Sequence, residues 1–217
     1  MSMTPEDAAY EEYMSQLYEE HKQEAIEEFT DDRLKSYYND NRLLAKPAFD
    51  ALIEARKLIE INATAGLIFA AIAMEVGLKE TLLKPIVFGL VHAAPVATLI
   101  TDLAISYSSM DQYRELLLQI LQQHGGVNLD TYLRSGSKKP VWQEIKEVQK
   151  QRNLVLHRAE TASDEKAHLA LGVASTIVES LFPAVVSKMG MHLHDGFRIC
   201  SDWKCNYKGK PKWEDDW

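Results

Sequence analysis

The sequence predicts an all-α protein: a helical bundle with an acidic N-terminal helix and a small hairpin at its C-terminal end. Three observations support this fold class. Apolar residues recur at helical spacing along most of the chain, prolines and short polar residues stand where helices would begin and end, and no strand-like alternation occurs before Met191. With 217 residues, 46% of them hydrophobic, the chain is long enough for one sizeable core. Its composition excludes collagen-like, disulfide-scaffold and wholly disordered proteins.

We expect three parts: an N-terminal extension (1–45), a helical bundle (46–190) and a hairpin-like tail (191–217). The first 32 residues carry eleven acids against one lysine, and their apolar positions recur loosely at helical spacing. Thr4 and Pro5 suit the N-cap and the first position of a helix. This acidic amphipathic helix is either a solvated helix that packs through one apolar stripe or an arm that mimics or masks a nucleic-acid site.

The first half of the bundle contains two strongly patterned helices. One starts near Pro47, and Asn62 is the predicted N-cap of the next, which runs over 63–84 and is closed by Pro85. Small residues in that second helix allow a close approach of another helix: Gly66, Ala70, Ala71, Ala73 and Gly77. Further helices are expected at 85–92, 95–106 and 109–124.

Two longer helices complete the predicted bundle. One begins at Pro140 and runs to His157. The other, over 165–188, is opened by a capping sequence that includes Ser163, is kinked in its last turns by Pro183 and is stopped by Gly190.

The charge pattern indicates one basic segment on an acidic protein. The formal net charge is -8, so the surface as a whole repels nucleic acids and acidic membranes. Residues 138–158 nevertheless carry six basic residues against two acids, a formal charge of +4. A polyanionic partner such as RNA must meet this segment, and its candidate contacts are Lys138, Lys139, Lys146, Lys150 and Arg158.

The common catalytic signatures are absent from the sequence: there is no phosphate-binding glycine loop, no His-Glu-x-x-His, no Gly-x-Ser-x-Gly and no paired Cys-x-x-Cys. What stands out is Arg152 and His157, five residues apart, with Asn153 beside the arginine. An arginine can hold a phosphate bidentately and stabilise its growing charge, and a histidine can move protons near neutral pH. Such a set could cleave RNA without a metal, because RNA supplies its own 2′-hydroxyl nucleophile. Alternatively, Arg152 and His157 occur together by chance in a helix and have only a structural role.

The five-residue spacing constrains the geometry of this pair. Five residues at about 100° each place the two side chains roughly 140° apart on a straight helix. Arg152 and His157 therefore converge only if the helix ends between them or if a second subunit contributes to the site.

The pattern Arg-Asn-x-x-x-His at 152–157 resembles the signature of the HEPN superfamily, an arginine and a histidine separated by four to six residues, with a polar residue after the arginine. Its position after a Trp-containing amphipathic helix and before a long apolar helix is similar to that family, as is the Ala-rich segment LIFAAIAMEVGLKETLLK, in which Glu75 is the only acid between Glu60 and Glu80. The resemblance covers roughly residues 47–188. It implies a HEPN-like helical bundle and a two-fold homodimer with both motifs in one cleft. In catalytic members it implies a metal-independent endoribonuclease that leaves a 2′,3′-cyclic phosphate.

Carried over to this chain, the resemblance assigns roles to single residues. Arg152 would bind the scissile phosphate, His157 would act as general acid or base, Asn153 would support the site, and Glu75 would orient Arg152. The implied setting is that of a toxin or an anti-phage defence effector, with RNA as substrate and an antitoxin or regulatory protein as a further partner. Some family toxins carry an antitoxin-modified tyrosine two residues after the histidine. Here that position is Ala159, which argues against this mode of silencing.

Two other functions stay open. The first is a non-catalytic HEPN-like module that binds a nucleotide or a protein through the same residues. The second is a helical adaptor without a nucleic-acid role, for which the acidic N-terminal helix is the best support. We expect no cofactor, and no metal ligands among the site residues.

The tail from Met191 has an Asp-Gly dipeptide between alternating polar and apolar residues, which predicts a hairpin. Four of its residues are of types that bind zinc, but their spacing, His-x-His-x5-Cys-x4-Cys, fits no common zinc finger. They are His192, His194, Cys200 and Cys205. Three interpretations stay open: two thiols without a metal role, a disulfide, or a zinc site.

We expect a cytoplasmic protein without membrane contact. The N-terminal residues are acidic rather than a basic flank followed by an apolar run, so they do not resemble a secretory signal. The low cysteine count fits a reducing compartment. The most apolar stretch, 85–100, is shorter than the roughly 18 residues that suggest a membrane span.

Overall fold

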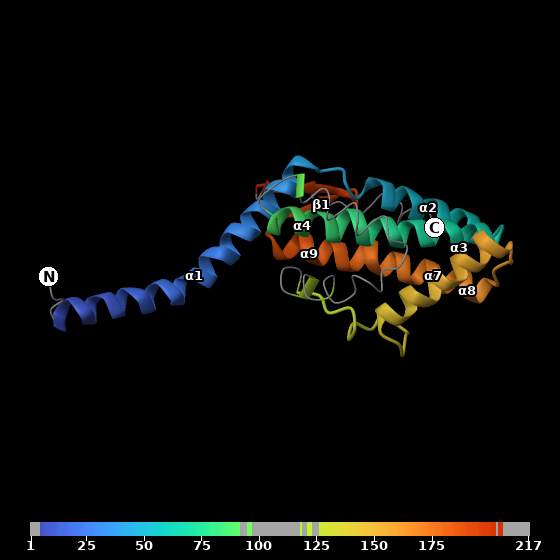
Figure 1. The fold of residues 1–217 in the computed structure, drawn as a ribbon. Coiled ribbons are helices and arrows are strands. Elements are labelled where there is room, and N and C mark those ends of the chain that lie inside the picture. Colours follow the sequence, from blue (N-terminus) through green and yellow to red (C-terminus); the bar gives the residue numbers. More distant parts are fainter. Residues whose placement is uncertain are drawn as a thin grey trace.

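The computed structural model describes residues 5–91, 95–96, 118, 121–122, 126–202 and 204–205. Over these residues the chain is mainly helical, with a two-stranded hairpin near its end, as the sequence predicts. The helices lie side by side in an elongated bundle from which the N-terminal helix projects (Figure 1). The helices predicted at 95–106 and 109–124 fall largely outside the described residues.

Helix α1 (Pro5–Asp40) begins at the predicted proline and has two distinct parts. Its N-terminal half extends away from the bundle (Figure 1), and Tyr10 and Tyr13 are exposed there. Its last turns enter the core, where Leu34 and Tyr38 are fully buried. The acidic helix is therefore a projecting arm that is anchored at its C-terminal end.

Helices α2 (Lys46–Ile59) and α3 (Ala63–Val76) pack against each other across a short connection. Asn62 caps α3 as predicted, because its side-chain oxygen accepts a hydrogen bond from the backbone N–H three residues on, at 3.0 Å. Gly66 lies directly on α2: a Cβ added there would be 2.7 Å from the Cα of Ile59. The prediction that small residues permit a close helix approach is confirmed at this position.

The prediction that Pro85 closes the helix begun at Asn62 is wrong. The chain continues through a π-helix, η1 (Gly77–Leu83), into α4 (Lys84–Leu90), and Pro85 occupies the first turn of α4. Proline has no N–H for the carbonyl of Thr81, four residues earlier. The buried Tyr38 hydroxyl donates to that carbonyl instead, at 2.8 Å. A contact from α1 thus supplies this carbonyl with a donor at a point where proline offers none.

The last long helix consists of α8 (Asp164–Ser175), a second π-helix, η3 (Thr176–Leu181), and α9 (Phe182–Lys188). Ser163 caps it as predicted, and the π-helical turns come just before Pro183, near the predicted kink. Within the described part of the chain, this helix alone is long and apolar enough to cross a membrane, with a mean hydropathy of 1.8. Of that apolar stretch, 56% is buried inside the bundle, so these side chains form much of the core.

The predicted hairpin is present. Strands β1 (His192–His194) and β2 (Arg198–Cys200) pair antiparallel around an Asp-Gly turn in which both residues have positive φ. The hairpin packs on α9 and on α1. Ile199 is buried, and its N–H donates to the carbonyl of Arg42 at 3.0 Å, so the tail is joined to the bundle by both apolar and backbone contacts.

Candidate functional site

Helix α7 (Val141–Arg158) carries the Arg-Asn-x-x-x-His motif on its last turns. The helix starts after Pro140, as predicted, and ends where Ala159 adopts the left-handed conformation with φ 53°. One side of α7 packs on α3 and α8. The motif therefore lies at the C-terminal end of a helix whose other side faces solvent.

Arg152 faces α3 and forms an ion pair with Glu75, from guanidinium Nη2 to carboxylate Oε1. The two side chains are 24% and 20% exposed. Partial removal from water strengthens the Coulombic attraction between the two groups, and the carboxylate holds the guanidinium in one orientation. The contact between Glu75 and Arg152 that the sequence analysis expects is thus present in the fold.

His157 lies on a different face of the same helix. Because α7 continues through both residues, Arg152 and His157 diverge by roughly 140° within one chain. His157 and Asn153 are both exposed, and their four-residue spacing places them on one face, so Asn153 accompanies the histidine rather than the arginine. Because α7 does not end between the two residues, one chain does not bring Arg152 and His157 together at one point.

Two exposed aliphatic side chains lie next to the ion pair. Leu156 is one turn beyond Arg152 on α7 and is 55% exposed, and Ile72 is one turn before Glu75 on α3 and is 42% exposed. The two helices pack against each other. The ion pair is therefore bordered by apolar surface, a feature that is common where proteins meet other proteins.

A groove of about 790 Å³ lies between α7, α8 and the loop that precedes α7. Lys138 and Lys139 line it from the loop, Lys150 from α7 and Lys166 from the first turn of α8. Together with Arg134, five basic side chains face three carboxylates. The groove is thus a concave surface with an excess of positive charge, which suits an anionic ligand.

The predicted basic residues are divided by the fold. Lys138, Lys139 and Lys150 meet in the groove, whereas Lys146 and Arg158 are exposed elsewhere on α7. Lys166 lies outside the continuous basic segment and was not predicted, because only the fold brings α8 alongside that segment. The Glu147 carboxylate accepts a hydrogen bond from Lys139 at 2.5 Å, and this bond raises the pKa of that lysine.

A buried carboxylate supports the loop that bears these lysines. Glu144, only 2% exposed, accepts hydrogen bonds from Arg134 Nε and from the Ser137 hydroxyl, both at 2.7 Å. Two bonds and a countercharge satisfy a group that would be costly to bury alone. Gly172 of α8 leaves room for this arrangement, because a Cβ there would lie 3.2 Å from Arg134 Nη1. From the sequence alone Glu144 is only one negative charge in the basic segment, because its supporting role depends on Arg134 and Ser137 in the folded chain.

An exposed polar stripe connects the groove with the histidine. Lys150, Asn153 and His157 follow one another at three- and four-residue spacing, so they lie along one side of α7. Lys150 lines the groove, and His157 is two turns further on. A polyanion seated in the groove could follow this stripe to the imidazole.

One further set of side chains could hold a metal. Among the described residues, donor atoms of the required types come together at the hairpin, on His192, His194, Cys200 and Cys205. These residues lie on β1, on β2 and just after β2, on other elements than Arg152 and His157.

The α7 surface therefore offers an oriented guanidinium, a solvent-exposed imidazole and a basic groove. Such groups can bind a phosphate chain and transfer protons. Comparison of the chain with protein-family models, with curated proteins and with solved structures found no match.

Proposed function

We propose that this protein is a metal-independent endoribonuclease of HEPN type that cleaves RNA by attack of the 2′-hydroxyl. The observation that carries the proposal is the Glu75–Arg152 ion pair, which orients an arginine on the helix that also bears His157. The basic groove beside α7 gives a polyanion a place to bind. The resemblance extends the proposal to a toxin or anti-phage effector that an antitoxin or regulatory protein controls.

Each motif residue has a separate task in this mechanism. Arg152 binds the scissile phosphate and stabilises the charge that develops on it, while Glu75 fixes the orientation of the guanidinium. His157 removes the proton of the 2′-hydroxyl or gives one to the leaving 5′-oxygen. Asn153, on the face of His157, supports the site by a hydrogen bond to the RNA.

The divergence of Arg152 and His157 within one chain supports the proposal that the enzyme acts as a dimer. One chain supplies a single motif histidine, whereas cleavage needs both a base and an acid. A two-fold pairing across the surface near Leu156 and Ile72 would cover apolar area and bring two motifs together. The active site is then a composite of both subunits.

A second candidate function is a non-catalytic HEPN-like module that binds a nucleotide or a protein. The separation of Arg152 and His157 on α7 favours it, because a single chain does not assemble the two groups at one point. In this case the groove would bind an anion and the motif would not turn it over.

Purified full-length protein incubated with mixed cellular RNA tests the proposal. We expect fragments that end in a 2′,3′-cyclic phosphate with the wild-type chain and none with His157→Ala. Binding of RNA without cleavage by the wild-type protein would support the binding module. Equal cleavage by wild-type and His157→Ala preparations would reveal a contaminating nuclease and overturn the assignment.

A further inference from the structure

One face of the hairpin packs on the core, and the other face carries histidine and cysteine side chains of the types that bind metals. Leu193 and Ile199 are cross-strand partners on the first face, and Ile199 is 1% exposed. Side chains alternate along a strand, so His192 and His194 share the opposite face. Cys200 is the cross-strand partner of His192, which brings it to that face as well.

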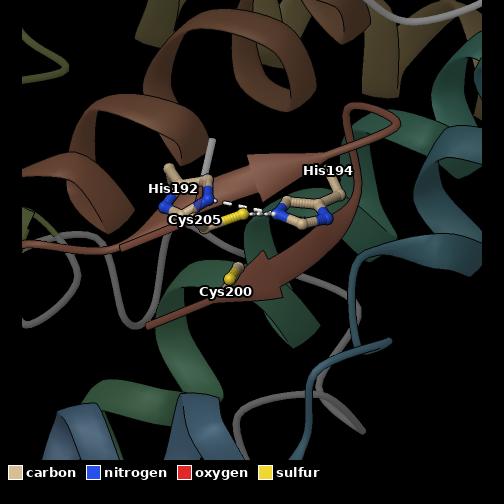
Figure 2. A group of neighbouring side chains, drawn as sticks. All are labelled: His192, His194, Cys200 and Cys205. Atoms are coloured by element: carbon tan, nitrogen blue, oxygen red, sulfur yellow. Dashed lines mark hydrogen bonds between the residues drawn. The ribbon is translucent and has the colours of Figure 1, made fainter. Parts of the chain in front are cut away.

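The fourth member comes from the chain that follows β2. The Cys205 sulfur lies 3.1 Å from His194 Nε2, and His194 Nε2 lies 3.1 Å from His192 Nε2. Figure 2 shows the Cys205 sulfur beside the two imidazoles, with Cys200 on the neighbouring strand. One donor atom from each of the four residues lies within 4.8 Å of all the others.

These separations are close to those of a tetrahedral metal site. Zinc bonds of about 2.0–2.1 Å to nitrogen and 2.3 Å to sulfur imply ligand-to-ligand distances of roughly 3.3–3.8 Å around a tetrahedron. Two of the donor pairs are 3.1 Å apart and none exceeds 4.8 Å, so movements of about 1 Å bring the four atoms to these distances. All four side chains are half-buried, so the site is accessible to an ion but shielded on several sides.

Hydrogen bonding alone does not account for the cluster as well as a metal does. A neutral ring nitrogen carries either one proton or one lone pair, so it makes one good hydrogen bond. His194 Nε2 instead has two close neighbours, His192 Nε2 and Cys205 Sγ. A cation at the centre would be bound by all of these atoms at once, with both thiols ionised.

We propose that His192, His194, Cys200 and Cys205 bind one Zn²⁺ in a closed, structural site. Two imidazoles and two thiolates suit this borderline-soft ion, and four protein ligands leave no position for a substrate. The ion would cross-link β1 to β2 and would hold Cys205 against the hairpin. Because Ile199 and its N–H already anchor the hairpin to the bundle, zinc would stabilise this end of the fold.

The test is the zinc content of the full-length protein, purified under reducing conditions with any affinity tag removed. We expect about one zinc per chain. Replacement by Co²⁺ should produce the intense visible bands of a tetrahedral site together with thiolate-to-metal charge transfer. His157→Ala is the matched control: it removes a histidine outside the cluster and should keep full zinc content, whereas Cys205→Ser and His194→Ala should lose most of it.

A measurement on the wild-type protein guards against variants that fail to fold. A mercurial reagent that modifies the two cysteines should release zinc in step with their modification. The proposal is overturned if the reduced, folded protein retains no zinc after incubation with the ion and dialysis. A Cys200–Cys205 disulfide in freshly purified protein, detected by mass spectrometry without reductant, would overturn it as well. Neither readout depends on RNA cleavage, so the zinc site and the proposed function can fail separately.

Discussion

Arg152 of α7 donates through Nη2 to the Glu75 carboxylate of α3, 77 positions earlier in the sequence. This ion pair joins two packed helices and fixes a guanidinium beside an apolar surface. A second pair, Arg56 with Glu179 at 2.6 Å, joins α2 to η3 with similar exposure, 20% for both side chains. The two pairs are alike in burial, but only the first belongs to the motif, which makes the second a natural control.

Arg152→Lys should lower the cleavage rate on the order of 10²-fold or more, because lysine keeps the charge but loses the planar fork that grips a phosphate. Glu75→Gln should lower kcat by roughly 10-fold with a smaller change in KM, because the guanidinium stays but is less well oriented. Steady-state kinetics on a short RNA measures both.

Arg56→Lys is the control, which should lower the stability of the fold and leave cleavage intact. Equal kinetic losses in Arg152→Lys and Arg56→Lys would mean that Arg152 is structural.

A mixed dimer tests how two chains divide the chemistry. In a dimer with one wild-type and one His157→Ala chain, isolated through two different tags, a shared site loses its only acid or its only base. Acid–base catalysis contributes on the order of 10²- to 10⁴-fold, so the rate should fall far below half of the wild-type rate. Retention of about half would show independent sites and contradict the composite arrangement, while ribonuclease activity itself would stand.

Cleavage should persist when free divalent metals are removed, because the proposed proton carrier is His157 and the RNA supplies the nucleophile. The measurement is the initial rate in EDTA. EDTA could also strip the proposed structural zinc, so Cys205→Ser protein is assayed without EDTA for comparison. A wild-type rate that vanishes in EDTA and returns only with Mg²⁺ or Mn²⁺ would contradict the mechanism.

The groove lysines should set the salt dependence of RNA binding. Each phosphate contact contributes a counterion-release slope of about 0.7 for single strands, so Lys138→Ala and Lys150→Ala should each reduce the slope of log Kd against log salt by nearly that amount. A 2′-O-methyl oligonucleotide, which cannot be cleaved, allows a binding titration. Lys57→Ala on α2, where Lys57 pairs with Glu54 at 2.8 Å, is the control. If Lys138→Ala and Lys150→Ala show the same salt-dependence slope as the control Lys57→Ala, the groove is not the RNA-binding site.

Gly66→Ala should destabilise the fold by about 1–3 kcal/mol, because the new methyl group would meet the backbone of Ile59. Gly77→Ala should cost less, since its nearest neighbours are the methyl tips of Ile177 and Val178, at 3.1 and 3.2 Å, which can shift. Urea denaturation of both variants measures the difference. A Gly66→Ala protein as stable as the wild type would contradict the close packing of α2 on α3.

Tyr38→Phe should destabilise the fold by about 1–2 kcal/mol at neutral pH, because the Thr81 carbonyl loses its donor. Burial raises the pKa of Tyr38 above its ordinary value, so at high pH the native state keeps this proton while the unfolded chain releases it. Tyr38 therefore contributes stability below about pH 10 that is lost as the pH rises further. In wild-type protein the free energy of unfolding should fall more steeply above that pH, by up to about 1.4 kcal/mol per pH unit, than in the variant. If the free energy of unfolding depends on pH in the same way in the wild type and in Tyr38→Phe, the hydroxyl of Tyr38 is not buried as described.

Much of the local structure follows from the sequence because its causes are local. Asn62 and Ser163 cap helices through their own side chains, Pro140 precedes a helix start, and an Asp-Gly pair makes the hairpin turn. Such signals depend on neighbours within a few residues, so they can be interpreted without the fold. Helical spacing likewise predicted that Arg152 and His157 diverge, and α7 runs through both of them.

Tertiary structure decided whatever depends on residues far apart in the chain. Pro85 does not end its helix: the chain passes through the π-helix η1 into α4, and Tyr38 of α1 donates to the Thr81 carbonyl, for which proline has no N–H. The groove needed Lys166 from α8 as well as the basic segment, and Glu144 became a support only when Arg134 folded onto it. The side chains of the proposed zinc site lie together because strand register sets His192 against Cys200 and the chain beyond β2 brings Cys205 back to them. Sequence spacing defines the angle between neighbours on one helix or strand, but only packing determines which distant segments come within bonding distance.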